Sequence, residues 1–151
     1  MAKIGVFVGS VFGGAEDVAQ DVITQLSSNG HTAQLYLDPQ LDDFLAYQND
    51  TIVVITSTTG QGEVPDNLLP LYVALNDQFP LMPKLSYGVI SMGDSSYGED
   101  RYCGAGRQFD EMLQQLQAKP VAERLDIDAC VSFDALEAAL PWLSRFLKQI
   151  V

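Results

Sequence analysis

Short apolar runs alternate with longer segments of helical period along this chain. The clearest run, residues 51–55, is apolar and β-branched after its first residue, which is typical of a strand buried on both faces of a parallel sheet. Strands are predicted at residues 3–8, 32–37, 51–55, 87–92 and, with a weaker pattern, 121–127. Helices are predicted at residues 15–26, 65–78, 106–117 and 134–150, with one short helical turn near residues 41–45.

This order of elements predicts an α/β fold. Strands joined by helical crossovers lie parallel, and right-handed crossovers place helices on both faces of the sheet. The simplest arrangement is a three-layer sandwich with a five-stranded parallel sheet in the order 2-1-3-4-5, formed by residues 1–151 as a single domain. Ligands of such sheets bind at the carboxyl ends of the strands, near the switch point between strands 1 and 3. The loops after strands 1, 3 and 4 are therefore the candidate site.

The last predicted helix is amphipathic, and the only histidine lies far from the candidate loops. His31 stands at the start of the second predicted strand and is expected on the surface. The inner face of the last helix is expected to carry Phe133, Leu136, Leu140, Leu143, Leu147 and Ile150.

The charge balance excludes several classes of partner. Eight Lys and Arg residues stand against 20 Asp and Glu residues, which gives a net charge of −12. Nucleic acids and anionic membranes bind through basic clusters, and the basic residues here do not cluster, so neither partner is expected. The acidity either serves solubility alone or steers the chain toward a basic protein partner.

The sequence also indicates in which cellular compartment the protein is expected. No apolar run approaches the ~20 residues of a membrane span, and no secretory leader is recognisable. Two cysteines, Cys103 and Cys130, are too few for a disulfide framework. These features favour a soluble protein of the reducing cytoplasm.

The first candidate loop, residues 9–15, reads Gly-Ser-Val-Phe-Gly-Gly-Ala and leads into a predicted helix. Helix N-terminal N–H groups, the Ser10 hydroxyl and two glycines that allow close approach make a phosphate cradle. Ala15 and Glu16 stand where a triphosphate-binding loop requires Lys and Ser or Thr. The pattern predicts a phosphate monoester; the alternative is a tight turn without a ligand.

The second candidate loop, residues 56–67, is rich in hydroxyl, glycine and amide residues. It is long for a plain connection, and its composition suits an adaptable hydrogen-bonding surface. The alternative is a purely structural loop.

The third candidate loop, residues 93–103, carries two tyrosines, Tyr97 and Tyr102, in a polar setting. Two aromatic rings at the carboxyl end of a strand suggest a platform for a planar ligand, although a packing role is the more common one for a single tyrosine. Cys103 has the form of a redox thiol, but no CxxC motif or nearby histidine supports that role.

Together the three loops resemble those of the short-chain flavodoxins, in particular small single-domain bacterial flavodoxins that are similar to the FMN domain of diflavin reductases. The resemblance covers the whole chain. Residues 9–15 resemble the family's phosphate loop, residues 58–67 its second flavin loop, and residues 93–97 with 102–106 its third. The resemblance implies a flavodoxin-like three-layer sandwich, FMN as the cofactor, and a monomer.

The resemblance also implies which residues contact FMN. The phosphate is expected at Ser10, Val11, Phe12, Gly13, Gly14 and Ala15. The edge of the ring is expected at Thr58, Thr59, Gly60 and Gln61. Tyr97 is expected to stack on one ring face. The backbone near the pyrimidine end is expected to come from Gly93, Asp94, Tyr102 and Cys103.

The chain departs from the family pattern at two positions. Ala15 replaces a hydroxyl residue that often ends the phosphate loop, and Thr59 stands where many relatives place an aromatic on the other ring face. The only tryptophan, Trp142, lies in the last predicted helix, away from the loops. That ring face is therefore expected to be open or loosely covered.

These observations predict an FMN-bound one-electron carrier with no catalytic residues or metal of its own. The expected partners are an NAD(P)H-dependent flavoprotein reductase with a basic docking face and acceptor enzymes that the sequence does not identify. One alternative, kept open by Thr59, is an FMN-dependent NAD(P)H reductase of quinones or similar small acceptors. Another is a flavin-bound accessory or regulatory partner. A phosphoacceptor receiver is excluded, because Gly9-Ser10 and Thr56-Ser57 stand where its acidic residues are needed.

Overall fold

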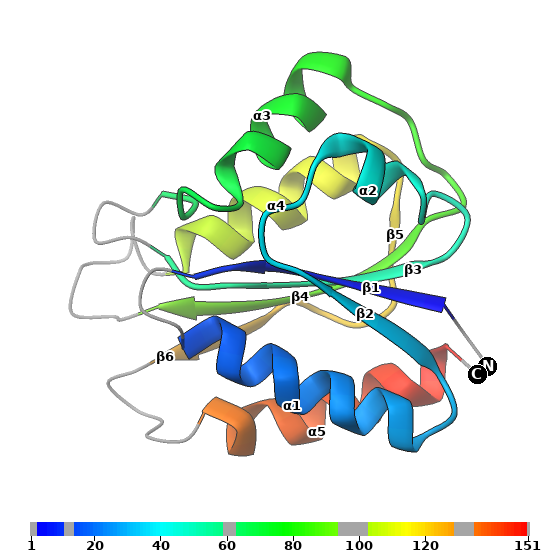
Figure 1. Cartoon of the computed structure of the whole chain (residues 1–151), viewed down its shortest axis with the longest axis vertical. Coiled ribbons are helices and arrows are strands. Elements are labelled where there is room, and N and C mark those ends of the chain that lie inside the picture. The colour runs from blue at the N-terminus through cyan, green and yellow to red at the C-terminus, as the bar shows by residue number, and fades with distance from the viewer. Residues whose placement is uncertain (1–2, 11–13, 59–62, 94–102, 129–134, 151) are drawn as a thin grey trace.

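Strands and helices alternate along the chain in the computed structural model, which describes residues 3–10, 14–58, 63–93, 103–128 and 135–150 (Figure 1). The strands are β1 (Lys3–Gly9), β2 (Thr32–Tyr36), β3 (Thr51–Thr56), β4 (Ser86–Gly93), β5 (Lys119–Pro120) and β6 (Leu125–Asp128). The helices are α1 (Gly14–Ser28), α2 (Leu41–Leu45), α3 (Leu69–Gln78), α4 (Gly104–Gln115) and α5 (Ala135–Gln149).

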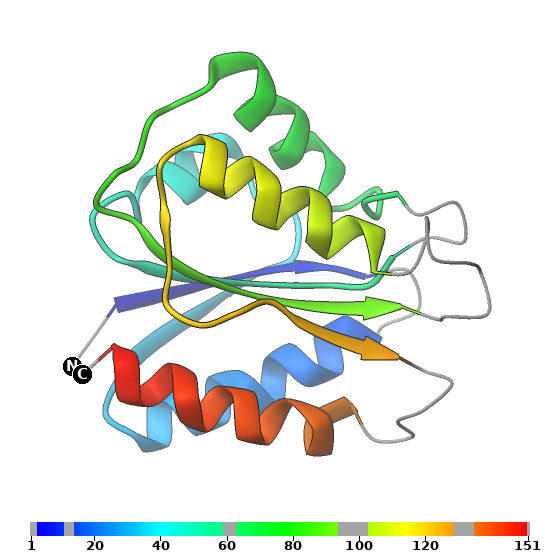
Figure 2. The same ribbon diagram turned by 180° about the vertical axis from the view of Figure 1, so that it is seen from behind.

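All strand pairs of the sheet are parallel, in the order β2-β1-β3-β4-β5, with β6 also paired to β4. Helices α1 and α5 cover one face, and α2, α3 and α4 cover the other, as Figures 1 and 2 show from opposite sides. The predicted strand order and three-layer architecture are confirmed. Within the described residues, no helix has both the length and the apolarity to cross a bilayer.

Two apolar cores lie on the two faces of the sheet. Successive strand residues point to opposite faces, so Phe7 packs under α2–α4 while Val6 and Val8 pack against α1 and α5. Every residue of β3 is buried, as its β-branched sequence predicts. Burying one such side chain contributes roughly 1.5–3 kcal/mol to folding, so the central strands form the rigid part on which the loops are mounted.

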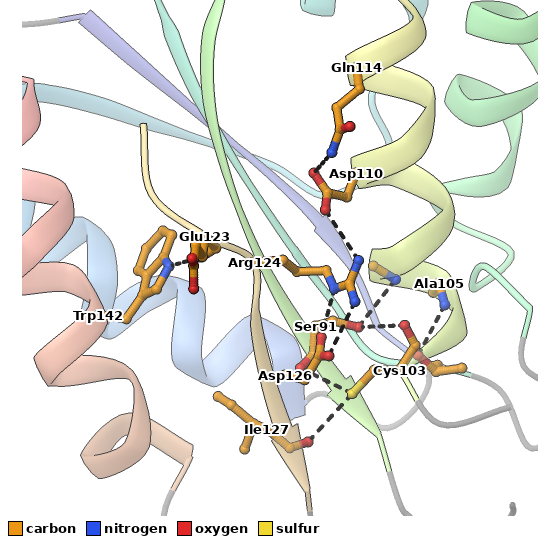
Figure 3. Close-up of polar contacts among 12 residues, drawn as sticks. Ser91, Cys103, Ala105, Asp110, Gln114, Glu123, Arg124, Asp126, Ile127 and Trp142 are labelled. Carbon is orange, nitrogen blue, oxygen red and sulfur yellow. Dashed lines mark hydrogen bonds and ion pairs between the residues drawn. The ribbon is translucent and has the colours of Figure 1, made fainter. Parts of the chain in front are cut away.

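The fifth strand position is divided, which corrects the single strand predicted at residues 121–127. Pro120 ends β5 and has no N–H for a ladder. The Glu123 carbonyl accepts a 2.6 Å hydrogen bond from the Trp142 indole N–H. The Arg124 guanidinium reaches Asp110 on α4 at 3.2 Å and Asp126 on β6 at 2.9 Å (Figure 3). In the segment between β5 and β6, contacts to helices on both faces thus take the place of pairing with β4.

These two carboxylates stabilise the positive charge of Arg124. Burial lowers the pKa of Arg124, but its hydrogen bond to Asp126 and the charges of Asp126 and Asp110 more than reverse this, so the net pKa is raised. The guanidinium therefore stays protonated and holds α4 and β6 together beside β4.

Helix α3 begins at Leu69, four residues later than the start predicted at residue 65. The N–H groups of Leu68 and Leu69 bond the Pro65 carbonyl and form a turn ahead of the helix. Pro70 lacks the N–H that would continue the helical ladder back to Asp66, so it stands in the first turn, where prolines are tolerated.

His31 is buried, with 9% of its surface exposed, and the expectation of a surface residue was wrong. Gly30 ends α1 at a φ of 85°, as the predicted Asn-Gly stop requires. The Gly30 N–H bonds the Ser27 carbonyl, and the His31 N–H bonds the Leu26 carbonyl. This Schellman motif folds His31 back over the last turn of α1, which explains its burial.

The inner face of α5 also differs from the prediction. Leu143 is buried as expected, but Leu140 is 42% exposed. The predicted Leu147 and Ile150 are half-buried against the same core, and Ala139, Trp142 and Phe146, which were not predicted there, are buried. The helix is therefore rotated toward its large aromatic residues. Phe133 and the side chain of Leu136 lie outside the described part.

The Tyr87 phenol gives a test of this packing. Tyr87 is 1% exposed and donates a 2.7 Å hydrogen bond to Asp110. Burial, and then Asp110, raise the pKa of this phenol. The unfolded chain releases the proton near pH 10, whereas the folded chain retains it, so stability falls as pH rises above about 10. In denaturant unfolding between pH 7 and 11.5, the free energy of unfolding of Tyr87→Phe should fall less steeply above about pH 10 than that of the wild type. An equally steep fall in both proteins would contradict the role given to Tyr87.

Candidate functional site

The carboxyl ends of β1, β3 and β4 lie side by side at one edge of the sheet, together with the N-terminal ends of α1, α3 and α4 (Figure 1). The register pairs Gly9 with Thr56, and Thr56 with Ser91. Thr56 and Ser91 are fully buried. Strands β1 and β3 end in this row and β4 ends two residues beyond it, at Gly93, so the three predicted loops leave the sheet close together, as the switch-point rule predicts.

The first loop leaves β1 at Ser10 and enters α1 at Gly14. The Ser10 N–H donates to Asn67 Oδ1 at 3.0 Å. The part of Ser10 that the predicted phosphate cradle could use is therefore its hydroxyl rather than its amide. Ala15 is fully buried, so its contribution to a ligand would come from its backbone.

The second loop is attached at both of its ends. After β3, the Ser57 N–H donates to the Gly9 carbonyl at 2.8 Å. Thr58 Oγ1 accepts a 3.3 Å hydrogen bond from the Ala105 N–H at the start of α4. Toward α3, Val64 is buried and Asn67 contacts β1. The loop thus contacts β1 near both of its ends and α4 at Thr58.

The third loop returns to the sheet through a clamp on Ser91 (Figure 3). The Ser91 hydroxyl donates to the Cys103 carbonyl at 3.1 Å and accepts from the Gly106 N–H at 3.2 Å. Cys103 has a left-handed backbone with φ 51°. A Cβ at Gly106 would overlap Cβ and Oγ of Ser91. Only a glycine therefore lets α4 approach β4 closely enough for this clamp.

The Cys103 side chain points into the protein (Figure 3). It is 1% exposed, and its sulfur lies 3.5 Å from the Ser91 carbonyl oxygen and 3.9 Å from that of Ile127. A catalytic thiolate requires exposure and a positive environment. This geometry favours a structural thiol, so what Cys103 offers a ligand is its backbone, as the family resemblance implies.

The structure brings Ser10, Gly14, Ala15, Thr58, Gly93 and Cys103 to this edge. The other predicted flavin contacts lie outside the described residues: Val11, Phe12, Gly13, Thr59, Gly60, Gln61, Asp94, Tyr97 and Tyr102.

Two residues that organise the edge were not assigned from the sequence. Asn67 was recognised only as part of the second loop, and Ser91 only as part of a buried strand. The signal for Ser91 is a lone hydroxyl among apolar residues, since a buried hydroxyl must find partners. No comparable local signal marks Asn67, because its partners on β1 and after β2 are distant in sequence.

The chemistry of the described donors suits a phosphate monoester attached to a neutral heterocycle. The described residues of the three loops contain no Lys or Arg. They offer hydroxyl and backbone groups, and the charged side chains among them are the exposed carboxylates of Glu63 and Asp66. The N-terminus of α1, a 15-residue helix, supplies N–H groups and a positive dipole end. Glu16 and Asp17 in its first turn share that dipole, which disfavours a more highly charged triphosphate. FMN has the chemistry that this edge fits.

Comparison with known proteins decides the family. The family model described as Flavodoxin matches residues 6–142. The chain belongs to the flavodoxin family. Flavodoxin YqcA of Escherichia coli (strain K12) is 42% identical over 146 residues, which cover 97% of each chain. Protein MioC of Escherichia coli O157:H7 is 35% identical over 148 residues, which cover 98% of each.

Two further relatives extend the flavodoxin comparison. The sulfite reductase [NADPH] flavoprotein alpha-component of Vibrio cholerae is 34% identical over 147 residues, which are 97% of this chain and 23% of that one. A solved single-site variant of flavodoxin from Pseudomonas aeruginosa superposes with a TM-score of 0.90 at 40% identity, covering 98% of each chain. Flavodoxins and part of a larger flavoprotein thus share this fold and sequence pattern.

The Ser91 clamp can be tested by mutation. Ser91→Ala leaves the Cys103 carbonyl and the Gly106 N–H without their buried partner, so the free energy of unfolding should fall by about 1–3 kcal/mol. Ser86→Ala, at the amino end of the same strand, is the matched control and should lower the free energy of unfolding by less. Denaturant unfolding of both variants measures this. Equal losses would show that the hydrogen bonds of Ser91 contribute no more to stability than Ser86 does.

Proposed function

We propose that this chain binds FMN at the carboxyl edge of its sheet and carries single electrons between protein partners. The observation that carries the proposal is the convergence of the three loops, with neutral hydrogen-bonding groups and a helix N-terminus, at the switch point of a flavodoxin-family sheet. Bound FMN would supply the chemistry, because its ring takes up and releases one electron at a time. Residues 1–151 are proposed to form one FMN-binding domain.

The proposed contacts follow the family resemblance. The phosphate end would be bound by Ser10, Val11, Phe12, Gly13, Gly14 and Ala15. The ring would be bound by Thr58, Thr59, Gly60, Gln61, Gly93, Asp94, Tyr97, Tyr102 and Cys103. The hydrogen bonds of Thr58 to α4 and of Ser57 to β1 support this assignment, because they draw the three loops together around one position.

The proposed partners are a basic NAD(P)H-dependent flavoprotein reductase and acceptor enzymes. The net charge of −12 and the exposed carboxylates of Glu63 and Asp66 in the second loop support a reductase with a basic docking face. Leu69 and Val73, which are 39% and 47% exposed on α3 next to that loop, add apolar surface of the kind that partner contacts bury. We propose that the carrier works as a cytoplasmic monomer.

A visible absorption spectrum of the purified protein tests the proposal. We expect a flavin band and one FMN released per chain by acid. NADPH should be oxidised only when a reductase is added, and added acceptor protein should then be reduced. A chain that binds no flavin would overturn the proposal. Steady-state NAD(P)H oxidation without a reductase would instead support an FMN-dependent reductase of small acceptors.

The acidic surface gives a quantitative prediction. One negative charge ~12 Å from the flavin ring, with an effective dielectric constant of about 60, costs an added electron about 0.5 kcal/mol, or on the order of 20 mV. Combining Glu63→Gln with Asp66→Asn should therefore raise the flavin midpoint potential by up to about 40 mV. The double variant should also slow reduction by a basic reductase at low salt.

The matched control combines Asp21→Asn with Asp77→Asn. Both carboxylates are exposed, and this pair changes the net charge equally but lies farther along α1 and α3 from the carboxyl edge. Its effect on the potential should be smaller, and the difference between the two pairs should shrink as salt increases. If both pairs shift the potential alike, only net charge matters and the carboxylates of the second loop have no special role.

A further inference from the structure

The side chain of Asn67 joins three segments at the carboxyl edge. Its Nδ2 donates to the Val8 carbonyl at 2.7 Å and to the Leu37 carbonyl at 2.6 Å. Its Oδ1 accepts from the Ser10 N–H at 3.0 Å. One side chain in the turn before α3 thus holds the end of β1, the chain that follows β2, and the first residue of the phosphate loop.

The three partners determine both the residue type and its orientation. Two carbonyl groups require two N–H donors, and the Ser10 N–H requires an acceptor, which only an amide side chain of this length provides. Turning the amide over would place its oxygen against two carbonyl oxygens. An aspartate would have the same conflict and would add a charge. The arrangement is therefore specific to asparagine.

The partners lie where strand pairing ends. The β1–β2 register stops at the pair Phe7 and Tyr36, so Val8 and Leu37 lie just beyond the last paired residues. Asn67 supplies the hydrogen bonds that a longer β2 would have made. The turn that carries Asn67 is itself anchored, because Leu68 is fully buried and the Leu68 and Leu69 N–H groups bond Pro65.

The two flavin loops depend on Asn67 to different degrees. The second loop keeps other attachments without it, through Ser57 to Gly9 and through Thr58 to Ala105. At the first loop, the Ser10 N–H bonds directly to the Asn67 side chain. Loss of the Asn67 amide should therefore release the start of the phosphate loop more than it disturbs the second loop.

We propose that Asn67 is a positioning residue that fixes the phosphate loop relative to the second loop. The chain then prefers phosphorylated FMN over riboflavin. This inference rests on the proposed function, since it assumes that the first loop binds the phosphate. Asn67 acts through Ser10 and need not touch the ligand.

The test compares the binding of FMN and of riboflavin to apoprotein, measured by quenching of free-flavin fluorescence. Asn67→Ala should weaken FMN binding about tenfold or more, the scale expected when buried polar groups lose a partner. Riboflavin binding should weaken much less, so the preference for FMN over riboflavin should fall. If both ligands weaken by the same factor, Asn67 serves only the stability of the fold and the proposal is overturned.

Tyr87→Phe is the matched control. It removes a buried hydrogen bond to Asp110, near the amino end of β4 and far from the loops. It should lower the melting temperature of the apoprotein without changing the preference for FMN over riboflavin. A change in that preference equal to that of Asn67→Ala would show that any loss of stability has this effect, and would overturn the proposal.

A measurement on the unmodified protein covers the case in which Asn67→Ala does not fold. Amide hydrogen exchange at Ser10 reports the opening of its bond to Asn67. Bound FMN should slow this exchange more than bound riboflavin does at matched saturation, because the phosphate holds the same loop. Equal protection by the two ligands would overturn the proposal. Failure of the wild type to bind either flavin would instead refute the proposed function.

Discussion

The backbone groups at the carboxyl ends of β1, β3 and β4 are covered by helices on both faces of the sheet, and they must find hydrogen-bond partners inside the protein. Within the sheet each strand is paired with its neighbours, but the pairing of β1 with β3 ends at Gly9 and Thr56, and that of β3 with β4 ends at Thr56 and Ser91. An unpaired buried N–H or carbonyl costs about 1–3 kcal/mol. The polar side chains at this edge therefore serve first to complete the sheet.

The candidate site follows from how this need is met. Asn67 supplies partners beyond the end of β2, and Ser91 does so between β4 and α4. Each draws in a segment distant in sequence, so the starts of the phosphate loop and of α4 are placed by the same hydrogen bonds that satisfy the sheet. A binding site built on such contacts is rigid at its base, where precision is needed to hold a cofactor.

The described residues at this edge combine hydrogen-bonding groups with an acidic surface. The one described cysteine at the edge directs its thiol into the interior. The described loop residues offer neutral donors and acceptors together with the exposed carboxylates of Glu63 and Asp66 in the second loop. Such a surface can attract a basic partner and, through its negative potential, make a bound electron acceptor harder to reduce.

Much of this protein follows from its sequence alone. The buried, β-branched runs and the helical segments between them predicted the parallel sheet, its strand order and the edge that carries the loops, because hydrophobic periodicity and the handedness of crossovers are local properties. The fifth strand, the start of α3, the burial of His31 and the exposure of Leu140 were decided by tertiary contacts. The contacts of Trp142 and Arg124 interrupt the pairing with β4, Pro70 delays the helix, and the turn after α1 folds His31 inward. The same holds for the site. The glycine, hydroxyl and aromatic residues of the loops were visible in the sequence, whereas the roles of Asn67 and Ser91 arise from partners brought close only when the sheet forms.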